Sequence, residues 1–246
     1  MEMHKEKIVG IHAVRILLKI RPFDVYEIFL TDKNSSKFNE IISLAKKNNI
    51  SINKISAEKI YEYSNVKSHQ GVLAFTRRKK EILEKNLFEF LKGKSKDHII
   101  LMLDEFSDPR NFGACLRICD AYDVSAVIVK DHDFAKFNET SKKVAAGAAE
   151  TVPIIRVKNI SRVLNLLKKN NYWTYAASER ADHDANEIQF KFPLALVIGD
   201  EGKGLRKKTL ENCDFKVKIN MLGEIESLNL AVATGIIINT IRKQIK

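Results

Sequence analysis

A chain of 246 residues with 45% hydrophobic side chains, ten glycines and four prolines has enough apolar material for one large domain or two modest ones. The net charge of +11 makes a polyanion the natural partner, and residues 1–97 carry +8 of it. A genome bias towards Lys and Asn is the alternative source of this charge. No run approaches the ~18 apolar residues of a membrane helix. The absence of a signal-peptide core and the three cysteines predict a cytoplasmic protein with free thiols.

The first 76 residues alternate between amphipathic helices and short strands. Helices are predicted over 10–19, over 36–48 and from Ser56, and strands at 25–30, 50–53 and 71–75. These elements predict a small α/β domain over residues 1–76. The next segment, 77–97, is densely charged but has one amphipathic patch, and it is predicted to be a charged linker that contains one helix.

From His98 onward the pattern is that of a larger α/β domain, predicted over 98–246. Residues 99–103 form a nearly continuous apolar run, as expected for a parallel sheet that is covered on both faces. Strands and helices then alternate to the end of the chain. The other predicted strands are 126–129, 153–156, 173–177 and 195–198, and the predicted helices are 112–122, 141–149, 160–169 and 227–245.

Two stretches near the C-terminus, 196–205 and 219–230, predict a small-molecule pocket. Each brings a strand end into a polar, glycine-bearing loop, and α/β proteins bind their ligands at such positions. The first loop, Gly199-Asp-Glu-Gly-Lys-Gly204, does not match G-x-G-x-x-G, and its acidic residues would repel a pyrophosphate. A dinucleotide cofactor is therefore not expected.

Neither of the two candidate metal groups is convincing. Cys115 and Cys119 lie four residues apart on one predicted helix, but no third ligand follows them, so they are predicted to be packing residues. The segment Asp182-His183-Asp184 could bind a metal or act as a base, but a solvated loop is the preferred interpretation. No metal is expected.

Three ordered motifs resemble those of the SpoU (TrmH) family of RNA 2′-O-ribose methyltransferases, which use S-adenosyl-L-methionine (AdoMet). The motifs are Asn111-x-Gly113-x-x-x-Arg117, Gly199-x-Glu201-Gly202-x-Gly204 and Ser227-Leu228-Asn229. Further segments resemble the subgroup that methylates a guanosine in 23S ribosomal RNA, namely 10–14, 69–71, 142–150 with Pro153, and 181–183. The similarity covers nearly the whole chain. One departure is Asn220, where the family usually has proline, and this change is expected to loosen the third loop.

The resemblance implies a SPOUT-type catalytic domain at residues 98–246, with a mainly parallel sheet and a deep trefoil knot, which is rare among protein folds. It also implies that the small α/β N-terminal domain binds RNA. A homodimer formed through the C-terminal domain is expected. The apolar composition of the last helix agrees, because a helix that is apolar on nearly all sides must be buried in a core or against a partner.

The resemblance also assigns the residues of the cofactor pocket. Gly199, Ile219, Met221 and Leu228 would line it, and Glu201, Ser227 and Asn229 would organise its loops. The chemistry is compatible, because glycine permits close backbone approach, Ile and Leu can sandwich an adenine, and an acidic turn suits a cationic sulfonium.

The resemblance places Arg117 at the centre of the reaction, with Asn111 as a positioning residue. A ribose 2′-hydroxyl is a poor nucleophile until its proton is removed or shared. Either Arg117 takes this proton, or it stays charged and stabilises the developing alkoxide. Structural alternatives remain open: Arg117 could be an ordinary surface residue, Asn111 a helix cap, and Ser227 or Asn229 the cap of the last helix.

The sequence therefore predicts an AdoMet-dependent 23S rRNA guanosine-2′-O-methyltransferase. Two alternatives stay open at this point. One is a non-catalytic RNA-binding or ribosome-assembly factor, and the other is a methyltransferase of the same fold that acts on tRNA.

Overall fold

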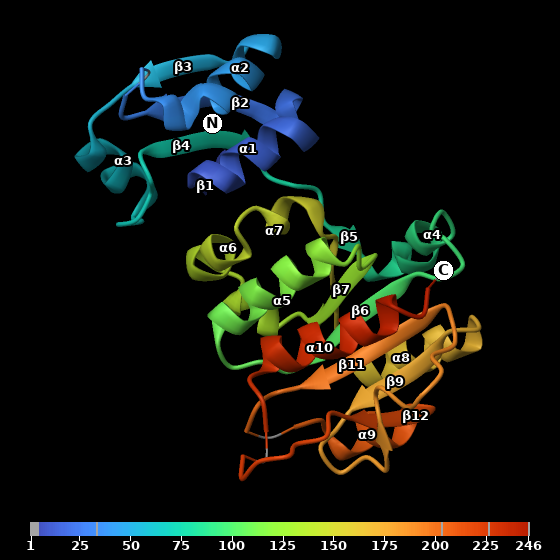
Figure 1. Ribbon diagram of the computed structural model, residues 1–246. Coiled ribbons are helices and arrows are strands. Elements are labelled where there is room, and N and C mark those ends of the chain that lie inside the picture. The colour runs from blue at the N-terminus through green and yellow to red at the C-terminus, as the bar shows by residue number, and fades with distance from the viewer. Residues whose placement is uncertain (1–4, 33, 203, 226, 246) are drawn as a thin grey trace. The chain divides into compact units, whose positions relative to one another are not determined.

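The computed structural model describes residues 5–32, 34–202, 204–225 and 227–245. The chain divides into two compact units (Figure 1). The first comprises Met1–Lys80 with Ala145–Thr151, and the second comprises Glu81–Val144 with Val152–Lys246. No helix of the described residues is long and apolar enough to cross a membrane.

The first unit is built on a four-stranded sheet in the order β1-β4-β2-β3. β4 is antiparallel to β1 and β2, and β3 is parallel to β2. Its elements are β1 (Lys5–Val9), α1 (Ile11–Ile20), β2 (Val25–Leu30), α2 (Asn39–Lys47), β3 (Ser51–Lys54), α3 (Ala57–Ser64) and β4 (Val72–Arg77). Buried residues of α1 and α2, such as Leu17 and Ile41, pack with Ile28 of β2 in one core. The prediction missed β1, an edge strand in which three consecutive charged residues precede the buried Ile8.

The second unit is built on an eight-stranded sheet in the order β10-β12-β9-β11-β6-β7-β8-β5. All its ladders between described residues are parallel. The strands are β5 (Ile82–Leu83), β6 (Ile99–Asp104), β7 (Ala126–Lys130), β8 (Ile154–Val157), β9 (Trp173–Ala177), β10 (His183–Asp184), β11 (Leu194–Gly199) and β12 (Phe215–Lys218). The predicted α/β class with a mainly parallel sheet is confirmed, and the trefoil knot stays a prediction.

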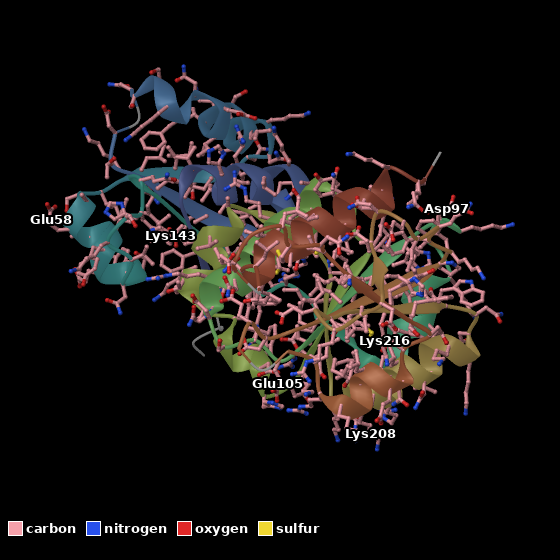
Figure 2. The ribbon with its side chains drawn as sticks, turned by 60° about the horizontal axis from the view of Figure 1, so that its bottom comes forward. Glu58, Asp97, Glu105, Lys143, Lys208 and Lys216 are labelled. Carbon is pink, nitrogen blue, oxygen red and sulfur yellow. The ribbon has the colours of Figure 1, made fainter. Side chains whose placement is uncertain are left out.

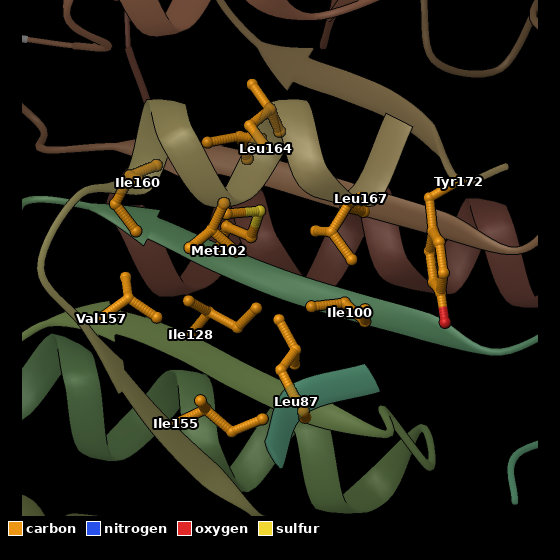
Figure 3. Close-up of a cluster of buried hydrophobic side chains, with 14 of the residues drawn as sticks. Leu87, Ile100, Met102, Ile128, Ile155, Val157, Ile160, Leu164, Leu167 and Tyr172 are labelled. Atoms are coloured by element: carbon orange, nitrogen blue, oxygen red, sulfur yellow. The ribbon is translucent and has the colours of Figure 1, made fainter. Parts of the chain in front are cut away.

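Helices cover both faces of this sheet, as the continuous apolar strands require. They are α4 (Leu87–Leu91), α5 (Pro109–Ala121), α6 (Glu139–Ala145), α8 (Ile160–Lys169), α9 (Lys207–Asn212) and α10 (Leu230–Arg242). Figure 1 shows α5 and α10 side by side, and the two helices are in contact. On the other face, Ile160 and Leu167 of α8 point towards β6, and they share one buried cluster with its residues Ile100 and Met102 (Figure 3).

Two predicted segments differ from the structure. The helix predicted over 141–149 is interrupted, because Ala146 (φ 50°) and Gly147 (φ 99°) are left-handed and separate α6 from α7 (Ala148–Thr151). Within the predicted charged linker, 77–97, β5 extends the large sheet by pairing with β8, and Leu87 and Leu91 of α4 are buried in the core. The amphipathic patch of this segment is therefore a core contribution, while the domain boundaries remain a prediction.

The three cysteines are buried in the second unit, and burial raises the pKa of Cys115 and Cys213 to about 12 and that of Cys119 well above its ordinary value. A raised pKa keeps a thiol protonated, and only the thiolate is reactive. We therefore expect dithionitrobenzoate at pH 8 to titrate no fast thiol in the native protein and three equivalents in denaturant. A fast equivalent under native conditions would contradict this burial.

Candidate functional site

A cavity of about 340 Å³ opens at the carboxyl ends of β9, β11 and β12. This volume falls within the range of small-molecule sites, roughly 300–1,000 Å³. Its lining includes five of the seven residues predicted to bind the cofactor, namely Gly199, Glu201, Ile219, Met221 and Leu228. It also includes Ser178, Glu179 and Arg180 after β9, Leu205 and Leu210 around α9, and Ala233 and Ile237 of α10. The pocket predicted from the two glycine-bearing stretches therefore exists as one cavity.

The first pocket loop folds back on itself at Gly199. A Cβ at this position would lie 2.2 Å from the carbonyl oxygen of Gly204, which no side chain could tolerate. Asp200 and Gly204 form an isolated antiparallel bridge, in which the Gly204 amide donates to the Asp200 carbonyl at 2.8 Å. Gly204 itself is left-handed, with φ 63°. The glycines are thus needed for the close return of the backbone.

One oxygen of Glu201 joins all three sequence motifs. Its Oε1 accepts hydrogen bonds from Asn111 Nδ2 at 2.7 Å, Asn229 Nδ2 at 2.6 Å and the Leu230 amide at 2.8 Å. Asn229 Nδ2 also lies 2.9 Å from Asn111 Oδ1. Residues that are 118 positions apart in sequence therefore meet at one carboxylate on the pocket wall.

The residues that cap α5 and α10 decide between the functional and capping roles considered for Asn111, Ser227 and Asn229. The Asn229 side chain caps α10 by accepting from the Ala231 amide at 3.0 Å and the Val232 amide at 3.4 Å, so it has a structural role as well as a place in the junction. The capping role considered for Asn111 is wrong, because α5 begins earlier and Asp108 is its cap. Ser227 neither caps the helix nor lines the cavity.

Arg117 lies elsewhere on the second unit. It is exposed on α5, six residues after Asn111, which corresponds to about 9 Å along the helix axis. It is not among the residues that line the cavity, and none of the described residues pairs with it. Its neighbour Ile118 lines a shallow apolar groove together with Tyr122, Val232 and Ile236.

Comparison with known proteins places this site in a family. The model of the SpoU rRNA methylase family matches residues 98–239, and the model described as RNA 2′-O ribose methyltransferase substrate binding matches residues 7–82. This chain belongs to the SpoU rRNA methylase family.

Individual relatives extend the match along nearly the whole chain. The 23S rRNA (guanosine-2′-O-)-methyltransferase RlmB of Escherichia coli K12 is 38% identical over 232 residues, which cover 94% of this chain and 95% of the relative. RlmB of Haemophilus influenzae is 39% identical over 245 residues, with 97% and 98% coverage. The AdoMet complex of the SpoU methyltransferase AviRb from Streptomyces viridochromogenes has the same fold, with a TM-score of 0.79, 20% identity and coverage of 98% of this chain and 90% of that one.

The departure from the family pattern at Asn220 has a structural counterpart. The Asn220 amide donates to Asp184 Oδ2 at 3.1 Å, a hydrogen bond that proline could not make. Asp184 is buried and lies in β10, which pairs with β12. The solvated loop predicted for Asp182-His183-Asp184 is therefore wrong at its last two residues. This hydrogen bond acts against the expected loosening at Asn220, which stays a prediction.

The prediction missed the segment after β6 that supports the pocket loop. Asp200 Oδ1 accepts from both the amide and the hydroxyl of Ser107, each at 2.9 Å. Glu105, which has a left-handed backbone (φ 82°), forms an ion pair with Arg206. Figure 2 shows Glu105 at the same end of the second unit as Lys208 of α9. The sequence did contain a signal for this segment, because polar residues follow directly after the buried strand β6.

Proposed function

We propose that this protein transfers the methyl group of AdoMet to the ribose 2′-hydroxyl of a guanosine in 23S ribosomal RNA. The observation that carries the proposal is the junction at Glu201, where all three family motifs meet on the wall of one cavity. Identity of 38–39% over nearly the full length of RlmB proteins supports the same reaction and the same RNA.

The residues around the cavity suit AdoMet. Ile219, Met221 and Leu228 supply apolar surface for an adenine, and Gly199 brings the strand end into the lining of the cavity. Among the described residues, the charged members of the lining are three carboxylates and two cations, a net negative charge that complements a cation; they are Glu179, Asp200, Glu201, Arg180 and Lys218. When bound there, AdoMet would supply a methyl group made electrophilic by its sulfonium. Glu201 and Asn229 would hold the loops in register, as would Ser227 from the loop before α10.

In the proposed reaction the 2′-oxygen forms a bond to the methyl carbon while the carbon–sulfur bond breaks, and the hydroxyl proton must leave. Arg117 is the proposed catalytic residue, either as the acceptor of that proton or as a fixed positive charge beside the developing alkoxide. Asn111 would position the reacting groups from the same helix, since its side chain is already held by Glu201 at 2.7 Å.

The RNA is proposed to bind through the N-terminal α/β domain as well. We place this domain at residues 1–76, the linker at 77–97 and the catalytic domain at 98–246. The +8 charge of residues 1–97 favours phosphate contacts, and the substrate-binding family model matches residues 7–82.

We also propose a homodimer formed through the C-terminal domain. Val232 and Ile236 of α10 are 49% and 37% exposed, although the rest of that helix is largely buried, and they flank the apolar groove beside Ile118. Such an exposed apolar face marks an interaction site. Val232→Glu combined with Ile236→Glu is expected to give a monomer in sedimentation velocity, since two charges would be buried without partners.

The matched control for this variant is Leu83→Glu, which adds a charge at another apolar side chain that is 50% exposed in the same unit. It should sediment like the wild type. A wild-type monomer, or a double variant that stays dimeric, would contradict the proposed interface.

The reaction itself is tested by incubating the full chain with AdoMet labelled in its methyl group and either 23S rRNA or tRNA. Label on a guanosine 2′-oxygen of 23S rRNA is the expected result. Label on a base would contradict the reaction, and label on tRNA alone would favour the tRNA alternative. Calorimetry that detects no AdoMet binding would favour a non-catalytic RNA-binding factor.

A further inference from the structure

A buried charge pair lies at the carboxyl ends of the adjacent strands β6 and β7. Lys130 Nζ lies 2.7 Å from Asp104 Oδ1, and the two residues are 3% and 0% exposed. The angles of this contact are not those of a regular hydrogen bond, and neither atom has another hydrogen-bond partner among the described residues. Glu105 is a more distant second carboxylate, at 3.9 Å from Lys130.

The other oxygen of Asp104 holds α9. Asp104 Oδ2 accepts a hydrogen bond from Thr209 Oγ1 at 2.6 Å, and Thr209 is only 1% exposed. Thr209 is adjacent to Leu210, and Leu205 lies just before α9; both leucines line the proposed AdoMet cavity. Asp104 is also the register partner of Gly199, where the pocket loop begins. Asp104 is thus linked to two sides of the cavity, to α9 through Thr209 and to the pocket loop through its pairing with Gly199.

The chemistry explains why this carboxylate needs Lys130. A buried, unpaired carboxylate is strongly disfavoured, and it would gain a proton or draw in water. A nearby ammonium compensates for the hydration that a buried carboxylate loses, and hydrogen bonds to charged groups are stronger than those between neutral groups. An apolar residue in place of Asp104 could fill the same volume, but it could not accept the hydrogen bond that fixes the position of Thr209.

We propose that Asp104 and Lys130 are positioning residues for the cofactor pocket. They act through Thr209, which sets the position of α9 and therefore of Leu205 and Leu210 against the ligand. This inference rests on the proposed function, because it concerns the affinity for AdoMet. It assigns the pair no contact with the reacting atoms.

Thr209→Val tests the link with almost no change in volume. Calorimetry with the purified full chain should show the Kd for AdoMet rising about 10- to 150-fold, the range expected for the loss of one hydrogen bond to a charged group. Thr209→Ser retains the hydroxyl and should restore binding to near the wild-type value. At saturating AdoMet, the kcat for 23S rRNA should stay close to that of the wild type.

Asp104→Asn tests the same hydrogen bond by removing the charge of its acceptor. Because Asp104 is proposed to act through Thr209, the double variant Asp104→Asn with Thr209→Val should bind AdoMet no more weakly than the worse of the two single variants. Additive losses would overturn the proposed route.

Thr174→Val is the matched control, since Thr174 Oγ1 donates to Asp214 Oδ2 at 2.7 Å in an equally buried position that does not line the cavity. It should lower the melting temperature but leave the Kd for AdoMet unchanged. If Thr209→Val also melts earlier but binds AdoMet like the wild type, the network is purely structural and the inference is overturned. Failure of the wild type to bind AdoMet would instead overturn the proposed function, and the inference with it.

Discussion

Arg117→Ala is expected to lower methyl transfer to 23S rRNA by about 10²–10³-fold, the usual effect of removing one group that stabilises developing charge. The Kd for AdoMet should stay unchanged, because Arg117 is not among the residues that line the cavity. Single-turnover transfer of a labelled methyl group, with calorimetry on the same preparation, measures both quantities.

A second substitution tests whether a positive charge at this position is enough for activity. Arg117→Lys keeps a positive charge on a flexible stem, so it should recover part of the rate if Arg117 acts as a fixed charge. The control is Arg162→Ala on α8, because Arg162 is exposed and pairs with Glu84, away from the cavity. Full activity of Arg117→Ala, or an equal loss with Arg162→Ala, would contradict a catalytic role for Arg117.

Glu201→Ala is expected to produce the largest loss of AdoMet affinity, about 30- to 1,000-fold. It removes the shared acceptor of three donors, including Asn111 Nδ2 and Asn229 Nδ2, and each hydrogen bond to a charged group contributes roughly 1.5–3 kcal/mol. Glu201→Gln retains one carbonyl oxygen and should lose less. Calorimetric titration with AdoMet gives the Kd of each variant.

The control for this series is Glu224→Ala, which removes an exposed carboxylate from the loop that leads to α10. It should bind AdoMet like the wild type. If Glu201→Ala retains wild-type affinity, the junction does not organise the cofactor pocket, and the proposed arrangement of the three motifs is wrong.

The sequence predicted the large sheet well, because its strands are nearly continuous apolar runs. Ile99–Asp104 and Leu194–Gly199 are buried at every position, and a run of this kind has few alternatives to a covered parallel strand. The pocket was predicted for a similar reason, since glycine-bearing loops at strand ends constrain where a ligand can lie.

The parts that were missed depend on contacts between residues distant in sequence. β5 has two residues and becomes a strand only by pairing with β8, so no local pattern could have predicted it. The bond from Thr209 to Asp104 joins residues 105 positions apart. The helix break at Ala146 was missed because a run of small residues is compatible with an uninterrupted helix.

Helix α10 lines both the cavity and the apolar groove. Ala233 and Ile237 line the cavity, while Val232 and Ile236 on the adjacent side line the apolar groove. If a shift of this helix changes both the affinity for AdoMet and the proposed subunit association through the groove, the two changes in free energy are equal, since such linkage is reciprocal. The measured affinity for AdoMet would then depend on protein concentration.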